Sequence, residues 1–315
     1  MTIEFAQARG DAPTASLVFY VPSGIAATLS AGAGTTIGAA SASVTAADLG
    51  NAVVPLAGSL VVRGPGDTFL SAGAQVPLAL AATSCTGSAS HAAFWVIVLS
   101  AAGQTLEVPI FVDPIAADAA EAPFATAKIT VCLPPPDLPA GTPGRAALGA
   151  GLLDAALSVK GVFGAGSGEY RWRLRATPYT PASGQPDVAG TVEAQSLLRV
   201  PAAITFSAKP IKGRRAANVS GTLTEGGKPV AGVTVKIICK VVLAVVRTDA
   251  AGHFAARVSG LAVPKDTLFA QAVAPVRDLG AAGCQPSFPA LNFPCVDALV
   301  DGFTVTSRKV GVRTR

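Results

Sequence analysis

The sequence predicts an all-β protein built from tandem antiparallel β-sandwich domains, with little helix. Three observations support this prediction. The chain of 315 residues contains 33 Gly and 24 Pro, which interrupt it too often for long helices. Only 19 acidic residues are present, so few charge pairs of the kind that decorate exposed helices can form. Turn-forming sequences recur about every ten residues, a spacing typical of sandwiches.

Several segments alternate apolar and polar residues with the period of a β-strand. In residues 170–175, Tyr and Trp side chains share one face and three Arg side chains share the other. Residues 106–112 and 233–237 alternate in the same way. Residues 92–99 are apolar on both faces, which predicts either a central strand covered on both sides or a strand at a domain interface. Further strands are expected at residues 16–21, 52–63, 128–132, 157–163 and 195–200.

Helix is expected only in short pieces. Residues 46–49 allow at most one turn, and residues 145–156 are the only stretch in which a short helix is plausible. Pro- and Gly-rich loops separate the strands. A basic connector near residues 202–215 predicts a boundary between residues 1–205, an enlarged Ig-like sandwich, and residues 206–315. An alternative is that residues 1–205 form two small sandwiches joined near 113–124.

The C-terminal part carries a motif in three pieces. Residues 219–223 read VSGTL, residues 226–235 read GGKPVAGVTV, and residues 248–254 read TDAAGHF. This pattern resembles the carboxypeptidase-regulatory-like, or transthyretin-like, family of small β-sandwiches, which includes the B-repeats of bacterial adhesins. The resemblance covers about 40 residues and implies a sandwich in which residues 248–254 form a hairpin turn. Gly252 is expected to supply a positive φ there and Phe254 to fill the core, with His253 outside.

The net charge of +5 is concentrated in two clusters, residues 209–215 and 308–315. Such clusters could bind an anionic cell-wall polymer or surface, but solvated connectors that protect sheet edges are the favoured interpretation. Neither cluster is interleaved with aromatic residues, which argues against nucleic-acid binding. The densest apolar run is too short to span a membrane.

Five cysteines occur without a C-x-x-C pair, which argues against zinc ribbons and thioredoxin-like chemistry. We expect two disulfides. Cys85–Cys132 would contribute about 4 kcal/mol and Cys284–Cys295, which flanks a Pro-rich loop, about 3 kcal/mol. Cys239 is left over in an apolar strand and is expected to be a free core residue. Since disulfides persist outside the cytoplasm, the pairing predicts export, with a signal peptide removed.

No catalytic, cofactor-binding or metal-binding residues are predicted. His91 opens a strand without a nearby Asp, His253 belongs to the turn at residues 248–254, and no G-x-S-x-G motif occurs. Carboxylates are scattered singly. The one candidate contact is the ladder of Arg171, Arg173 and Arg175, expected on an exposed strand face. It could bind a polyanion, or it could pair with acidic residues of a neighbouring strand.

These features favour a secreted or cell-surface, non-catalytic structural or adhesive protein of a bacterium, whose partners would be a cell-wall polymer or another protein. One alternative is a self-associating subunit of a surface layer or filament, consistent with the mean hydropathy of +0.50. A second is a hydrolase that carries an accessory sandwich.

Overall fold

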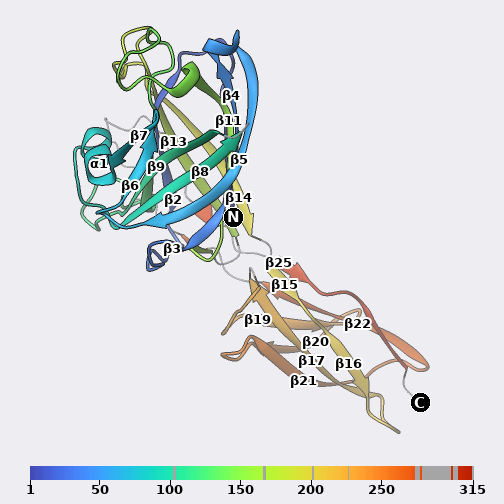
Figure 1. The fold of residues 1–315 in the computed structure, drawn as a ribbon. Helices are drawn as coiled ribbons and strands as arrows, with labels where there is room; N and C mark the ends of the chain where they lie inside the picture. Colours follow the sequence, from blue (N-terminus) through green and yellow to red (C-terminus); the bar gives the residue numbers. More distant parts are fainter. Residues whose placement is uncertain are drawn as a thin grey trace. The chain divides into compact units, whose positions relative to one another are not determined.

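The computed structural model describes residues 1–101, 104–165, 168–200, 202–225, 227–273, 277–278, 299–300 and 304–313 (Figure 1). It confirms the all-β fold class: β-strands make up most of these residues. Contacts divide the chain into two compact units. The N-terminal unit holds Met1–Gly164 and Trp172–Ser196, and the C-terminal unit holds the described residues from Leu197 onward together with Ala165–Arg171. No helix in the described part of the chain is long and apolar enough to cross a membrane.

The N-terminal unit is organised by one ten-stranded sheet. The neighbouring strands in this sheet are, in order, β1 (Thr2–Ala6), β11 (Ala150–Val159), β4 (Thr36–Ala46), β5 (Ala52–Arg63), β8 (Ala93–Ala101), β9 (Gln104–Pro114), β10 (Ala125–Cys132), β2 (Thr14–Pro22), β13 (Gly168–Pro178) and β14 (Val192–Val200). Two small sheets accompany it, β3 (Ile25–Ala27) with β12 (Phe163–Ala165) and β6 (Thr68–Ser71) with β7 (Ala74–Pro77).

One face of the large sheet is apolar across its centre. The register places Val62 beside Trp95 and Trp95 beside Ile110, so these side chains share a face. Val131 and Leu17 continue the same face on β10 and β2. All five are buried. The sheet curls strongly in Figure 1, and burial of this continuous face is what the alternating sequence predicts.

The opposite face of β8 and β9 is covered by a helix that the sequence did not predict. Helix α1 (Leu78–Thr86) packs Leu78 and Ala82 against Phe94 and Phe111. The central strand predicted at residues 92–99 is therefore covered on both faces. A helix at residues 145–156 is absent: these residues form the short 3-10 turn η2 (Ala147–Gly149) and then β11. The turn expected near residue 47 is the 3-10 turn η1 (Ala47–Leu49).

Residues 113–124 do not join two sandwiches. β9 ends at Pro114 and β10 starts at Ala125, and these strands pair within one sheet, with Val112 opposite Ile129. Residues 1–200 thus contribute to a single continuous sheet.

The C-terminal unit contains two five-stranded sheets. One comprises β15 (Ala202–Ile204), β16 (Ser207–Pro210), β17 (Ala216–Glu225), β18 (Lys228–Pro229) and β21 (His253–Ser259). The other comprises β19 (Thr234–Ile238), β20 (Val242–Arg247), β22 (Lys265–Val273), β25 (Thr304–Thr306) and β26 (Val310–Arg313). A further short pair is β23 (Arg277–Asp278) with β24 (Leu299–Val300). β15 precedes the boundary predicted at residue 206, yet it pairs with β17.

A shared core joins the two sheets. Phe254 and Leu223 from one sheet and Val235 and Ile237 from the other are buried in the same cluster. The glycine of the VSGTL motif is explained by this packing. A Cβ atom on Gly221 would lie 2.4 Å from the Phe254 ring and 2.1 Å from the Thr205 carbonyl oxygen, so no larger residue fits.

The TDAAGHF segment forms a tight turn, but not a hairpin. The Asp249 carboxylate accepts hydrogen bonds from the backbone N–H groups of Ala251 and His253, and Gly252 adopts a φ of +71°. However, β20 pairs with β19 while β21 pairs with β17, so the turn carries the chain from one sheet to the other. The expected turn with a positive φ at Gly252 is confirmed, whereas the expectation that the flanking strands pair with each other is wrong.

Candidate functional site

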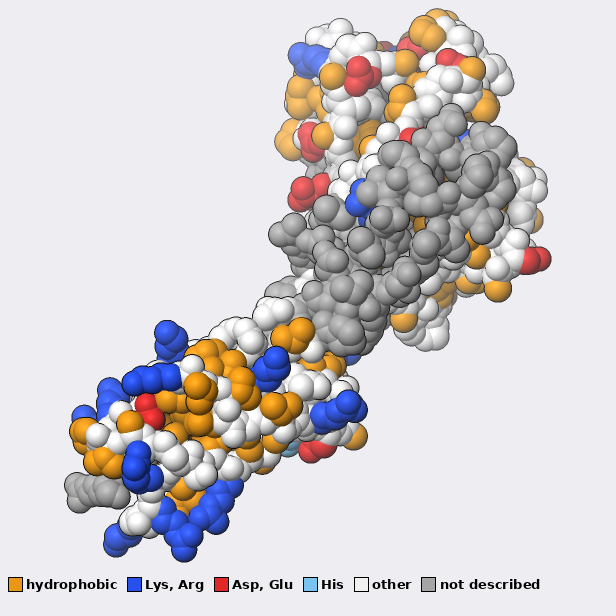
Figure 2. Space-filling view, turned by 180° about the vertical axis from the view of Figure 1, so that it is seen from behind, with side chains coloured by type: hydrophobic (Ala, Val, Ile, Leu, Met, Phe, Trp, Pro, Cys, Tyr) orange, Lys and Arg blue, Asp and Glu red, His pale blue; other side chains and the backbone are white. Residues whose placement is uncertain are grey.

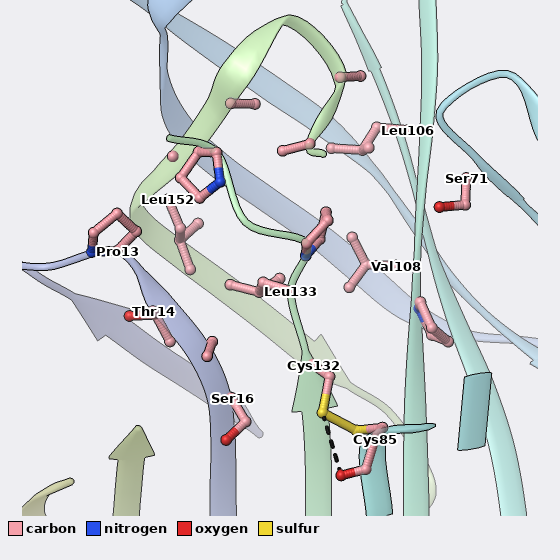
Figure 3. A pocket seen from close by; sticks show the side chains of 18 of the residues that line it. Pro13, Thr14, Ser16, Ser71, Cys85, Leu106, Val108, Cys132, Leu133 and Leu152 are labelled. Atoms are coloured by element: carbon pink, nitrogen blue, oxygen red, sulfur yellow. Dashed lines mark hydrogen bonds between the residues drawn. A yellow bond between two sulfur atoms is a disulfide. The ribbon is translucent and has the colours of Figure 1, made fainter. Parts of the chain in front are cut away.

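A cavity of about 520 Å³ lies at one end of the N-terminal unit. Leu106 and Val108 of β9 and Leu152 of β11 point into it, with Leu133 from the following loop (Figure 3). The Cys85–Cys132 bridge lies at one side of the cavity. The lining is mainly aliphatic, and Leu99, Leu106 and Val108 contribute to it from the apolar face of the large sheet.

The cavity forms where β10 leaves the sheet. β9 pairs with β8 from Ala101↔Gln104 to Ala93↔Val112, but its pairing with β10 begins only at Val131↔Ile110. Residues 104–109 therefore extend past the end of β10. Pro109 stands at this point, and proline has no N–H with which to continue the ladder. The gap left beside β9 is the space that the cavity occupies.

Two Pro- and Gly-rich loops, residues 133–149 and 179–191, border the cavity. Arg145 fixes the first loop: its guanidinium donates two hydrogen bonds of 2.7 Å to the Asp48 carboxylate and one of 2.6 Å to the Leu138 carbonyl oxygen. The hydrogen bonds from Arg145 hold the pKa of Asp48 below its usual value.

The second loop is held against the first. The Tyr179 hydroxyl donates to the Leu133 carbonyl oxygen at 2.6 Å, and burial raises the pKa of this tyrosine. The Ala182 N–H donates to the Asp137 carboxylate at 2.6 Å. These hydrogen bonds join the two loops, and most of the surface that lines the cavity is apolar. The cavity suits an apolar group better than a reacting polar substrate.

A second cluster joins the end of α1 to β9. The His91 ring is 3% exposed and packs against Phe94 and Phe111. Its Nδ1 lies 2.7 Å from the Asp113 carboxylate, and its Nε2 lies 3.0 Å from the Thr86 hydroxyl. The sequence showed no acid near His91, and this expectation was wrong: β8 and β9 pair in a register that places Asp113 beside it.

The contacts of His91 resemble a hydroxyl–His–Asp triad in spacing, but the hydrogen-bond directions oppose that function. Nε2 also lies 3.1 Å from the Ser88 carbonyl oxygen, which can only accept. The Thr86 hydroxyl donates instead to the Ala82 carbonyl oxygen at 2.9 Å. A general base must accept the hydroxyl proton through Nε2. The contacts of His91 instead tie the end of α1 to β9.

The structure places Arg171, Arg173 and Arg175 differently from the expected exposed ladder. Arg173 is 5% exposed, with its guanidinium carbon 4.4 Å from the centre of the Phe124 ring. Arg175 forms an ion pair with Glu193 of β14 at 3.4 Å, and Arg171 is partly buried. The prediction of three exposed guanidinium groups was wrong because Phe124 packs on Arg173 and Glu193 pairs with Arg175. The alternative expectation, pairing with an acidic residue of a neighbouring strand, fits Arg175, whose partner Glu193 lies on β14.

The predicted Cys85–Cys132 pair is a disulfide in the structure, with the two Cα atoms 5.8 Å apart. Cys239 is a free thiol, partly buried, which donates to the Asp266 carboxylate at 3.1 Å. Burial, and then the hydrogen bond to Asp266, raise the pKa of this thiol. The predicted Cys284–Cys295 bridge lies outside the described residues.

His253 is exposed, as expected, and lies with Asp249 in an open groove that is also lined by residues of β16 and β17. Among the described residues, no group of three or more His, Cys, Asp and Glu side chains is arranged to hold a metal ion.

Comparison of the chain with protein-family models and with curated proteins gives no match, so its assignment rests on this geometry.

Proposed function

We propose that the protein is an exported, non-catalytic structural or adhesive protein of a bacterial cell surface. The observation that carries this proposal is the Cys85–Cys132 disulfide, which joins α1 to β10. A bridge of this kind persists in an oxidising compartment and is rare in the cytoplasm. The polar clusters around His91 and Arg145 support a non-catalytic role, because their hydrogen bonds are directed into the fold.

Peptide mapping without reduction tests the compartment. Protein purified from the source organism should contain the Cys85–Cys132 linkage, and intact cells should bind an antibody raised against the folded protein. Free thiols at both positions, together with labelling only after lysis, would refute export.

An Ig-like N-terminal unit and a transthyretin-like C-terminal unit are part of this proposal, since rigid β-units act as spacers and adhesive modules.

Self-assembly into a layer or filament is the alternative kind of structural role. Light scattering after size-exclusion chromatography distinguishes the two: a monomer over a wide concentration range favours the spacer, and open-ended growth favours the filament. The third alternative, a hydrolase, would be supported by activity against a panel of ester and glycoside substrates.

The apolar cavity favours one additional role, the binding of an apolar molecule or acyl chain. A fluorescent fatty-acid analogue should bind the protein, and Leu106→Trp should weaken that binding because Leu106 lines the cavity. Leu80→Trp, on the exposed side of α1, is the matched control. Equal binding by both variants would show that the cavity is not the binding site.

A further inference from the structure

The two parts of the chain carry opposite charge. Residues 1–196 contain 8 Lys and Arg against 13 Asp and Glu, a net charge of −5. Residues 197–315 contain 16 Lys and Arg against 6 Asp and Glu, a net charge of +10. Figure 2 shows the C-terminal unit, low in the picture, with Lys and Arg side chains around hydrophobic ones and few acidic ones.

Four chain segments meet at one end of the C-terminal unit, here called the basic pole. They are the β16–β17 turn (residues 211–215), the β19–β20 turn with the first residue of β20 (239–242), the β21–β22 loop with the start of β22 (260–266) and the end of β26. Arg215 donates to the Leu261 carbonyl oxygen at 2.7 Å, which joins the first and third segments. Cys239 donates to Asp266, which joins the second segment to the start of β22. Lys265 pairs with Arg313 across β22 and β26.

Cationic side chains crowd this pole. Six of them are exposed, and none takes part in an ion pair described in the structure. They are Lys212, Arg214, Arg215, Lys240, Lys265 and Arg313. Asp266 is the one acidic residue in these segments, and its carboxylate already accepts hydrogen bonds from Cys239 and from the Ala262 N–H. Six clustered cations beside the single carboxylate of Asp266 leave an excess of positive charge, which predicts an anionic partner.

Exposed valines lie among these cations. Val241 in the β19–β20 turn is 65% exposed, Val263 in the β21–β22 loop is 55% exposed, and Val242 at the start of β20 is 49% exposed. A soluble polyanion would require only the positive charges of the basic pole and would make no use of the exposed valines. Large apolar side chains on loop tips, surrounded by Lys and Arg, match a surface with anionic groups outside and hydrocarbon beneath.

We propose that the basic pole docks on an anionic phospholipid bilayer, with Val241 and Val263 entering the interfacial region and the surrounding Lys and Arg contacting phosphate groups. A second copy of the chain is disfavoured as the partner, because two identical poles repel each other. The inference stands on the C-terminal unit alone and does not depend on the proposed surface role.

Vesicle flotation of the full chain tests the proposal. The protein should float with vesicles in which phosphatidylglycerol replaces part of the phosphatidylcholine, should not float with phosphatidylcholine alone, and should be released by salt. Replacing Lys212, Arg214 and Lys265 by Glu should weaken binding about fivefold or more for each cation removed. Val241→Ser with Val263→Ser should weaken binding about tenfold.

Matched controls lie on β20, away from the pole. Val245→Ser changes a valine that is 59% exposed, and Arg247→Glu changes a cation at the opposite end of the strand. Both should bind like the wild type, and thermal melting should confirm that every variant is folded. Undiminished vesicle binding by the double valine variant would overturn bilayer docking in favour of a purely electrostatic contact. Absence of binding to phosphatidylglycerol vesicles would overturn it as well, and so would a dimer that the valine changes abolish.

Discussion

Phe254 and His253 are adjacent in sequence but occupy opposite environments. Phe254 is 3% exposed in the core between the two sheets, whereas His253 is exposed. Phe254→Ala should destabilise the C-terminal unit by about 3–5 kcal/mol, because it removes a ring from a packed core. His253→Ala should have little effect, since it is the backbone of His253 that bonds to Asp249. Denaturant unfolding measures the stability lost in each variant. Equal losses would contradict the alternation in β21 that places Phe254 in the core and His253 in solvent.

Cys239 offers a second test at the level of one residue. Because burial and the neighbouring Asp266 raise the pKa of the thiol, the reactive thiolate should be scarcer at neutral pH than in an unfolded cysteine. Alkylation by iodoacetamide should therefore be slow and should accelerate as the pH rises through the raised pKa. Asp266→Asn removes the negative charge and should speed the reaction. A rate equal to that of a free thiol would contradict the contact between these side chains.

Helix α1 is attached to the sheet through two connections. The first is the hydrogen bond between His91 and Asp113, next to the end of the helix. A double-mutant cycle with His91→Ala and Asp113→Ala should give a coupling free energy of about 1.5–3 kcal/mol, the range for hydrogen bonds to charged groups. Additive effects of the two changes would show that the pair contributes nothing to stability.

The second connection is the disulfide between Cys85 and Cys132. These residues are 47 positions apart, so the bridge should contribute about 4 kcal/mol by restricting the unfolded chain. Cys85→Ser with Cys132→Ser should lower the melting temperature of the N-terminal unit, and dithiothreitol should lower that of the wild type similarly. Dithiothreitol should leave the double variant unchanged in this unit.

Strands were easier to predict than the elements that depend on distant contacts. The expected strand at residues 52–63 coincides with β5, because its ends are marked by turn residues. Helix α1 escaped prediction since it has no side-chain cap and no acidic residue in its first turn, and packing against Phe94 and Phe111 determines it instead. The proximity of His91 and Asp113 was accessible through the β8–β9 register. The cavity was not, because its walls come from many separate segments.

At the scale of the whole molecule, the two compact units should melt separately. Calorimetry should show two transitions, and Phe254→Ala should lower only the one that belongs to the C-terminal unit. A single transition that shifts as a whole in this variant would show that the units unfold together. An isolated fragment should begin near residue 197, because β15 pairs with β17.

The strand order of the large sheet also determines when each strand can pair while the chain is being synthesised. β2 lies between β10 and β13, and β1 pairs with β11, so the first strands to leave the ribosome have no partner until more than 100 further residues have been made. At about 5–20 residues per second, this wait is on the order of 5–30 seconds. During it, an apolar strand such as β2 is available to chaperones or to a translocation channel that accepts only unfolded chains. The late arrival of the partners of β2 therefore suits the export proposed above.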